Sequence, residues 1–98
     1  MTASREHGYT KDKAALVKRL HRIEGQVRGI ERMLEEDRYC IDILTQVQAI
    51  KAALRKVEDE LLKNHAAHCV EAAISDGDAG AQREKFNELV ELFGRFRA

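Results

Sequence analysis

Apolar residues recur through the first third of the chain at alternating spacings of four and three, the repeat of a helix that packs along one face. The repeat consists of Leu16, Leu20, Ile23, Val27, Ile30 and Leu34. It predicts a helix from about residue 11 to about residue 35, with Thr10 as its N-cap and the polar run 35–38 at its end.

A second repeat with the same alternation follows the first. It consists of Ile43, Val47, Ile50, Leu54, Val57 and Leu61. No Gly or Pro lies between Tyr39 and Asp76, so the pattern predicts one helix of roughly 35 residues. At 1.5 Å per residue this helix would be about 50 Å long, more than a compact monomer of this size covers. We therefore expect another subunit to bury much of its apolar face.

The remaining segments complete an all-α chain. Residues 75–80 hold turn-forming side chains and two glycines, which predicts a loop. A shorter amphipathic helix then carries Phe86, Leu89, Val90, Phe93 and Phe96. Residues 1–9 are polar and predicted to be a flexible arm, and residues 10–98 a single all-α domain.

Composition agrees with long helices and an oligomer. The 98 residues include no Pro, no Trp and only six Gly. A chain this short buries only about two-thirds of its unfolded surface, so a monomeric core would be marginal. Basic and acidic residues balance at 17 each, but the segment 11–35 is mainly basic and the segment 58–98 mainly acidic. With no signal-peptide pattern and no membrane-length apolar stretch, we expect a soluble cytoplasmic protein without a membrane partner.

His65 and Cys69 are four residues apart, so a helix places them on one face, one turn from each other. Cys40 precedes Cys69 by 29 residues, about 40 Å along an unbroken helix, so it can join them only from another subunit. Two thiolates and an imidazole favour Cu(I) over Ni(II) or Co(II). Zn(II) would need a fourth ligand, for which His7 and His68 are the candidates. Spacing alone leaves a buried structural cysteine as an equal alternative.

Three stretches resemble the copper-sensing repressor (CsoR) family, and the resemblance extends over about residues 8–97. They are residues 18–30 (KRLHRIEGQVRGI), 39–47 (YCIDILTQV) and 65–69 (HAAHC). The resemblance implies a three-helix protomer, an antiparallel four-helix dimer core and a disc-like dimer of dimers, a homotetramer. It also implies a repressor that binds operator DNA in the apo form and is released when Cu(I) binds Cys40, His65 and Cys69.

The same resemblance implies which residues surround the metal and which contact DNA. Copper sensors of the family place a Tyr and a Glu against the far nitrogen of the ligand histidine. Tyr39 matches the first and Glu88 the second, with Glu84 and Glu91 as alternatives. No helix-turn-helix pattern is present. The candidate DNA-binding residues are Lys18, Arg19, Arg22, Gln26, Lys51, Arg55 and Lys56. Arg19 and Lys56 match basic positions that the family uses, although a solvated helix face is the ordinary alternative.

Other functions fit the pattern less well. A thiol-based sensor of the same fold would use Cys40 and Cys69 with sulfane sulfur or an aldehyde, and His65 counts against it. A nickel/cobalt or zinc sensor and a plain helical oligomerisation module are further alternatives. No nucleophile with a base and an orienting group is recognisable, and no phosphate loop, so we expect neither an enzyme nor an organic substrate.

Overall fold

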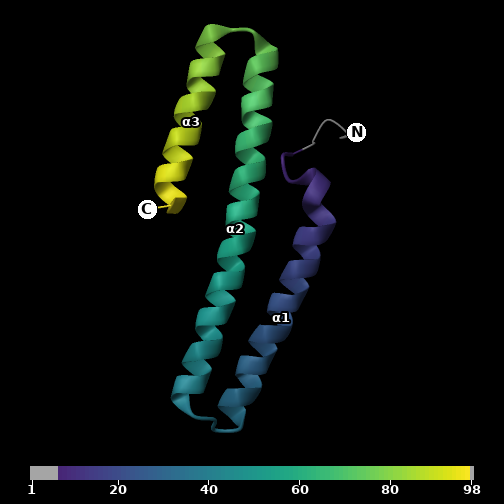
Figure 1. Cartoon of the computed structure of the whole chain (residues 1–98), viewed down its shortest axis with the longest axis vertical. Helices are drawn as coiled ribbons and strands as arrows, with labels where there is room; N and C mark the ends of the chain where they lie inside the picture. Colours follow the sequence, from purple (N-terminus) through teal and green to yellow (C-terminus); the bar gives the residue numbers. More distant parts are fainter. Residues whose placement is uncertain (1–6, 98) are drawn as a thin grey trace. The chain divides into compact units, whose positions relative to one another are not determined.

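The computed structural model describes residues 7–97, except for the side chains of residues 73, 76 and 97, and it is helical throughout (Figure 1). A short 3-10 turn, η1 (Thr10–Asp12), precedes the helices α1 (Lys13–Glu35), α2 (Cys40–Asp76) and α3 (Ala79–Arg97). The described range contains no strand, and no helix in it is long and apolar enough to cross a membrane. The predicted all-α, three-helix protomer is confirmed.

The chain forms two compact units, and α2 contributes to both. The α1 unit consists of Asp12–Asp59, which includes α1 and the first part of α2. The α3 unit consists of the remainder of α2 with α3 and the N-terminal segment, of which residues 7–11 and 60–97 are described. The candidate ligands are therefore divided, with Cys40 in the α1 unit and His65 and Cys69 in the α3 unit.

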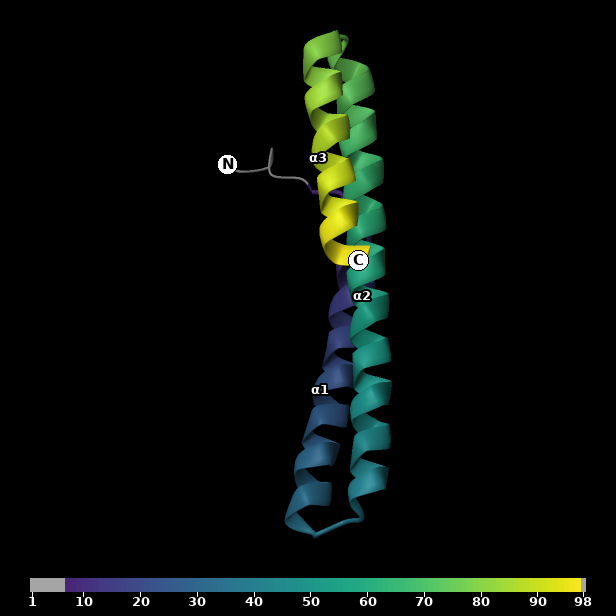
Figure 2. The ribbon, with the colours of Figure 1, turned by 90° about the vertical axis from the view of Figure 1, so that its left-hand side faces the viewer.

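In the α1 unit, α1 and the first part of α2 run antiparallel, side by side (Figures 1 and 2). The core consists of Leu16, Ile23, Ile50 and Val57, with Ile30 and Ala53 packed against it. Apart from Ala53, these are alternate members of the two apolar repeats. The other members on α1 are exposed, at 39% for Leu20 and 60% for Leu34. A single protomer therefore covers one side of each repeat and leaves the other side open.

The turn between α1 and α2 depends on Asp37, whose φ of 54° is in the left-handed region. The Asp37 N–H donates to the Leu34 carbonyl and the Arg38 N–H to the Met33 carbonyl, which closes the last turn of α1. Tyr39 immediately precedes α2, and its carbonyl accepts hydrogen bonds from the N–H groups of residues 42 and 43.

The start of α1 and the second loop differ from the prediction. Thr10 is not the N-cap of α1, because it lies in η1, where its hydroxyl accepts a 2.8 Å hydrogen bond from the His7 N–H. The loop is shorter than residues 75–80, because α2 extends to Asp76 and α3 begins at Ala79. Asp78 permits this early start, since its carboxylate accepts a hydrogen bond from the Gly80 N–H.

In the α3 unit, α3 runs back along the end of α2 (Figures 1 and 2). Leu62, Cys69 and Leu89 are its buried apolar residues. Residues 1–6, the larger part of the predicted arm, lie outside the described residues. At Gly8 the backbone lies so close to the Asn64 carbonyl and to His68 that a Cβ would overlap both. Position 8 thus tolerates only glycine while the segment stays against α2.

Candidate metal centre and nucleic-acid interface

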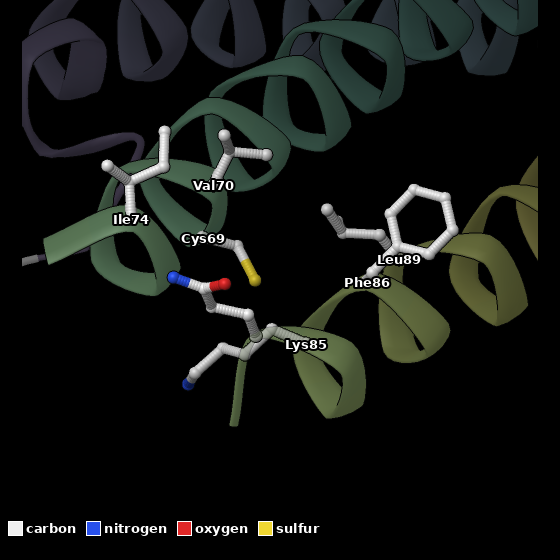
Figure 3. Close-up of a pocket in the computed structure, with 7 residues that line it drawn as sticks. Cys69, Val70, Ile74, Lys85, Phe86 and Leu89 are labelled. Atoms are coloured by element: carbon white, nitrogen blue, oxygen red, sulfur yellow. The ribbon is translucent and has the colours of Figure 1, made fainter. Parts of the chain in front are cut away.

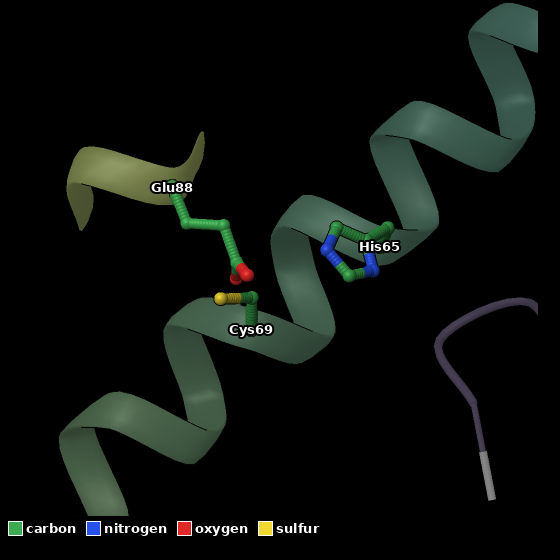
Figure 4. Close-up of side chains that lie close together, drawn as sticks. All are labelled: His65, Cys69 and Glu88. Atoms are coloured by element: carbon green, nitrogen blue, oxygen red, sulfur yellow. The ribbon is translucent and has the colours of Figure 1, made fainter. Parts of the chain in front are cut away.

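His65 and Cys69 lie on successive turns of α2, and Glu88 approaches them from α3 (Figure 4). A ring nitrogen of His65, the Sγ of Cys69 and a carboxylate oxygen of Glu88 all lie within 4.8 Å of one another. Cys69 is only 6% exposed, whereas His65 and Glu88 are open to solvent. The cluster therefore combines a covered sulfur with two accessible ligands.

The packing of α3 brings the carboxylate to this place. Leu89 is buried in the α3 unit, and its burial fixes the rotation of α3 about its own axis. Glu88, the preceding residue, is then directed to the edge of the helix contact, where it reaches the His65 and Cys69 side chains. Glu84 and Glu91, the alternatives from the sequence, do not belong to the cluster.

Cys40 and Tyr39 belong to the other unit and are not part of this cluster. Cys40 is the first residue of α2 and is exposed, and Tyr39 immediately before it is 68% exposed. His7 and His68, the candidate additional ligands, are also outside the cluster. Among the described residues, the predicted ligand set is thus assembled in part, as the pair His65 and Cys69.

The candidate DNA-binding residues all lie in the α1 unit. Most have exposed side chains, namely Lys18, Arg22, Lys51, Arg55 and Lys56. Arg19 is half-buried. Gln26 is half-buried, and its amide oxygen is buried without a hydrogen-bond partner among the described residues. Gln26 faces the helix contact because it follows the buried Ile23 by three positions.

Helical periodicity divides the basic residues of α2 into two sides. Lys51 and Arg55 share one side, while Lys56 projects about 140° away from Lys51 around the helix. Lys56 therefore lies on a different side of α2 from Lys51 and Arg55. Since α1 and α2 are antiparallel, Lys56 lies on the same face of the helix pair as the basic flank of α1. We call this set the basic face; it comprises Lys18, Arg19, Arg22 and Lys56.

The opposite face of the same helix pair is apolar. Its members are exposed by between 39% and 60%, and they are Leu20, Val27, Leu34, Leu44 and Leu54. Apolar side chains that gather on one face of a helix pair are seldom left open to water, so this face is suited to contact with another protein surface. We call it the apolar face.

Comparisons with known proteins place the chain among metal-responsive regulators. A family model described as metal-sensitive transcriptional repressor matches residues 12–95. The copper-sensing transcriptional repressor RicR of Mycobacterium tuberculosis is 57% identical over 81 residues, which cover 83% of this chain and 82% of RicR.

Two solved structures share the fold. The copper-sensing repressor CsoR with Cu(I) from Geobacillus thermodenitrificans NG80-2 matches with a TM-score of 0.75 and 46% identity, over 90% of this chain and 88% of that one. The nickel-responsive transcriptional regulator InrS matches with a TM-score of 0.74 and 37% identity, over 85% and 90%. Because the two TM-scores are nearly equal, the fold alone does not identify the metal.

Proposed function

Because the chain belongs to the metal-sensitive transcriptional repressor family, we propose that it is a repressor that responds to copper(I). In this proposal the metal-free protein binds operator DNA, and binding of Cu(I) by Cys40, His65 and Cys69 releases the DNA. The observation that carries the proposal is the pairing of the His65 imidazole and the Cys69 thiol on successive turns of α2. The copper-sensing relative and the Cu(I)-containing structure support the choice of metal.

The ligands suit Cu(I) by their chemistry. Thiolates and imidazole are soft or borderline ligands, and a set of two sulfurs and one nitrogen provides the low coordination number that Cu(I) accepts. The low exposure of Cys69 supports this choice, because shielding from water protects a soft metal–thiolate bond from competing oxygen ligands. Bound there, Cu(I) would supply a positive charge and a fixed link between the ligand side chains.

Cys40 reaches the other two ligands from a second copy of the chain. It precedes Cys69 by 29 residues within the single helix α2, and at 1.5 Å per residue this is about 40 Å. Two copies related by a two-fold axis then form two equivalent shared sites. Tyr39 accompanies Cys40, because the two are adjacent in the chain.

The apolar face supports this assembly. In a dimer the apolar faces of two protomers contact each other, so that α1 and α2 of both form an antiparallel four-helix core. Burying five partly exposed aliphatic side chains contributes roughly 1 kcal/mol or more for each side chain that becomes fully covered. We extend the proposal to a homotetramer formed from two such dimers.

The basic face would contact operator DNA. Lys18, Arg22 and Lys56 have exposed side chains that can neutralise phosphates, and Arg19 lies beside them on α1. Lys51 and Arg55 border the apolar face instead, so we assign them a smaller part in DNA binding. Gln26 has its amide oxygen buried and is not included in the contact surface.

Glu88 would couple the metal to α3. When one ring nitrogen of His65 binds Cu(I), the other can donate a hydrogen bond to the Glu88 carboxylate, which lies within reach. This contact differs between the metal-free and metal-bound states, and such a difference is what an allosteric response requires. Tyr39, brought in with Cys40, would complete the surroundings of the imidazole.

Glu88 also favours a second candidate function. A carboxylate oxygen next to an imidazole and a thiolate is a harder ligand set, of the kind that Ni(II) or Zn(II) accepts. If Glu88 binds the metal directly, the protein senses one of these ions, in line with its similarity to the nickel-responsive InrS.

One titration separates the two candidates. Operator DNA with a fluorescent label is bound by the metal-free protein, and Cu(I), Ni(II) or Zn(II) is added while anisotropy and thiolate–metal absorption are recorded. A copper sensor releases DNA with Cu(I) at stoichiometric amounts and retains it with the other two ions. Release by Ni(II) or Zn(II) alone would reject the copper assignment.

A further inference from the structure

A small hollow of about 190 Å³ lies beside Cys69, between the end of α2 and the first turns of α3 (Figure 3). Its walls come from one unit of the chain. The lining residues are Cys69, Val70, Ile74, Gln82, Lys85, Phe86 and Leu89. We call this hollow the entry pocket.

The entry pocket gives access to a thiol that is otherwise covered. Cys69 is 6% exposed, and its sulfur points into the space between the two helices (Figure 3). Ile74 and Phe86 at the sides of the pocket are 70% and 65% exposed, so the pocket opens to solvent past apolar side chains. A molecule that exchanges with the Cys69 sulfur can approach along this route.

One of the described residues that line the pocket carries a charge. This residue is Lys85, and the others are apolar apart from the Cys69 thiol and the Gln82 amide. Lys85 also borders a neighbouring groove that contains Glu84, Glu88 and Glu91. The lysine therefore lies where this groove, with its three carboxylates, meets the apolar hollow.

Copper(I) is transferred between soft ligands, and a complex with two thiolates carries a net negative charge. Such a complex, with short aliphatic thiols, combines a compact apolar body with an anionic centre. The apolar walls match its body, the Lys85 ammonium matches its charge, and the nearby carboxylates would repel it elsewhere on α3.

We propose that the entry pocket admits Cu(I) as an anionic complex with small thiols, and that Lys85 attracts this complex to Cys69. This inference rests on the proposed copper-sensing function. Lys85 is a positioning residue, because it acts on the incoming complex and is not a ligand of the bound metal. Lys85 controls the rate at which copper reaches Cys69. It does not change the final Cu(I) affinity of the site.

The exchange is balanced without any redox change. The Cys69 sulfur forms a bond to Cu(I) as one small thiolate leaves, and the Cys69 thiol proton passes to the departing thiolate. Cys40 of a second copy displaces the second small thiolate in the same way. Copper stays Cu(I), and two neutral thiols are released.

Stopped-flow transfer kinetics test the inference. Cu(I) is supplied in excess mercaptoacetate, whose carboxylates add negative charge, or in excess 2-mercaptoethanol, which adds none, and thiolate–copper absorption of the protein is followed. We expect Lys85→Glu to slow transfer from mercaptoacetate on the order of tenfold at low salt and to have a smaller effect with 2-mercaptoethanol. The difference in transfer rate between Lys85→Glu and the wild type should shrink as ionic strength rises.

Two further variants complete the experiment. Arg83→Glu makes the same charge change at an exposed position of α3 that does not line the pocket, and it should slow transfer much less than Lys85→Glu does. Ile74→Trp narrows the opening and should slow transfer from both donors. Equal rates for Lys85→Glu and Arg83→Glu, at unchanged final absorption, would overturn the inference and leave the proposed function intact. A wild-type protein that takes Cu(I) from neither donor would instead reject the proposed function.

Discussion

The carboxylate of Glu88 on α3 lies within 4.8 Å of the Cys69 ligand atom on α2, although the two residues are 19 positions apart in the chain. This proximity joins the third helix to the turn of α2 that carries the proposed ligands. In the proposed mechanism a change at the metal would reach α3 through this proximity, which makes Glu88 the natural place to interrupt the signal.

We predict that Glu88→Gln reduces the effect of copper on DNA binding more than it reduces copper binding. The amide keeps the shape but loses the charge that stabilises a donating imidazole, so the coupling free energy should fall by about 1 kcal/mol, roughly fivefold in operator affinity. Operator affinity measured with and without Cu(I) tests this. Glu91→Gln, outside the cluster, is the matched control. Wild-type coupling in Glu88→Gln would remove Glu88 from the pathway.

His65→Ala should keep Cu(I) binding but lose the release of DNA that Cu(I) causes. Cys40 and Cys69 retain measurable Cu(I) affinity as a pair of thiolates, but the variant has no ring nitrogen to engage Glu88. We expect Cu(I) to bind this variant without lowering its operator affinity. If copper released DNA from His65→Ala as it does from the wild type, the signal would have to travel by another route.

Arg19→Ala should weaken operator binding and reduce its salt dependence. The slope of log affinity against log salt should fall by about 0.9 for each phosphate that the variant no longer neutralises. Arg55→Ala removes the same charge from the side of α2 that borders the apolar face, and we expect a much smaller change in slope. A larger effect for Arg55 than for Arg19 would place DNA on the other face.

Asp37→Gly should stabilise the fold. A residue other than glycine in the left-handed region costs about 1–2 kcal/mol, which outweighs the roughly 0.5–1 kcal/mol of backbone entropy that glycine loses on folding, so the Tm should rise by a few degrees. Glu36, the C-cap of α1, has a φ of −90°, so Glu36→Gly should lower the Tm instead. Thermal unfolding followed by circular dichroism gives both values.

The apolar repeats predicted the helices well because they are long and uninterrupted. The predicted positions of the helix ends were less accurate, because Thr10 and Asp78 use local hydrogen bonds that hydrophobic periodicity does not encode. Composition alone could not show which of residues 75–80 belong to the loop, because α3 begins inside this segment although the segment is rich in turn-forming residues.

Contacts between helices were harder to predict from the sequence. Resemblance singled out Glu88, but its approach to Cys69 depends on how the burial of Leu89 rotates α3. The burial of the Gln26 amide oxygen could not be read from the sequence either, and a role of Gln26 in reading DNA stays a prediction. No sequence pattern pointed to Lys85, because the hollow beside it forms only when α3 packs on α2.

The central claim is that each copper site is shared between two copies of the chain and that copper bound there releases DNA. Cys40→Ser and Cys69→Ser should each fail to bind Cu(I) tightly when assembled alone, while both still bind operator DNA. A mixed dimer of the two variants, isolated with two different affinity tags, regains one complete site from the Cys40 of one chain and the His65 and Cys69 of the other. We predict about one tightly bound Cu(I) per mixed dimer in competition with a strong chelator, together with copper-dependent release of operator DNA. No tight copper binding by the mixed dimer, or undiminished copper response in either variant alone, would contradict the shared site.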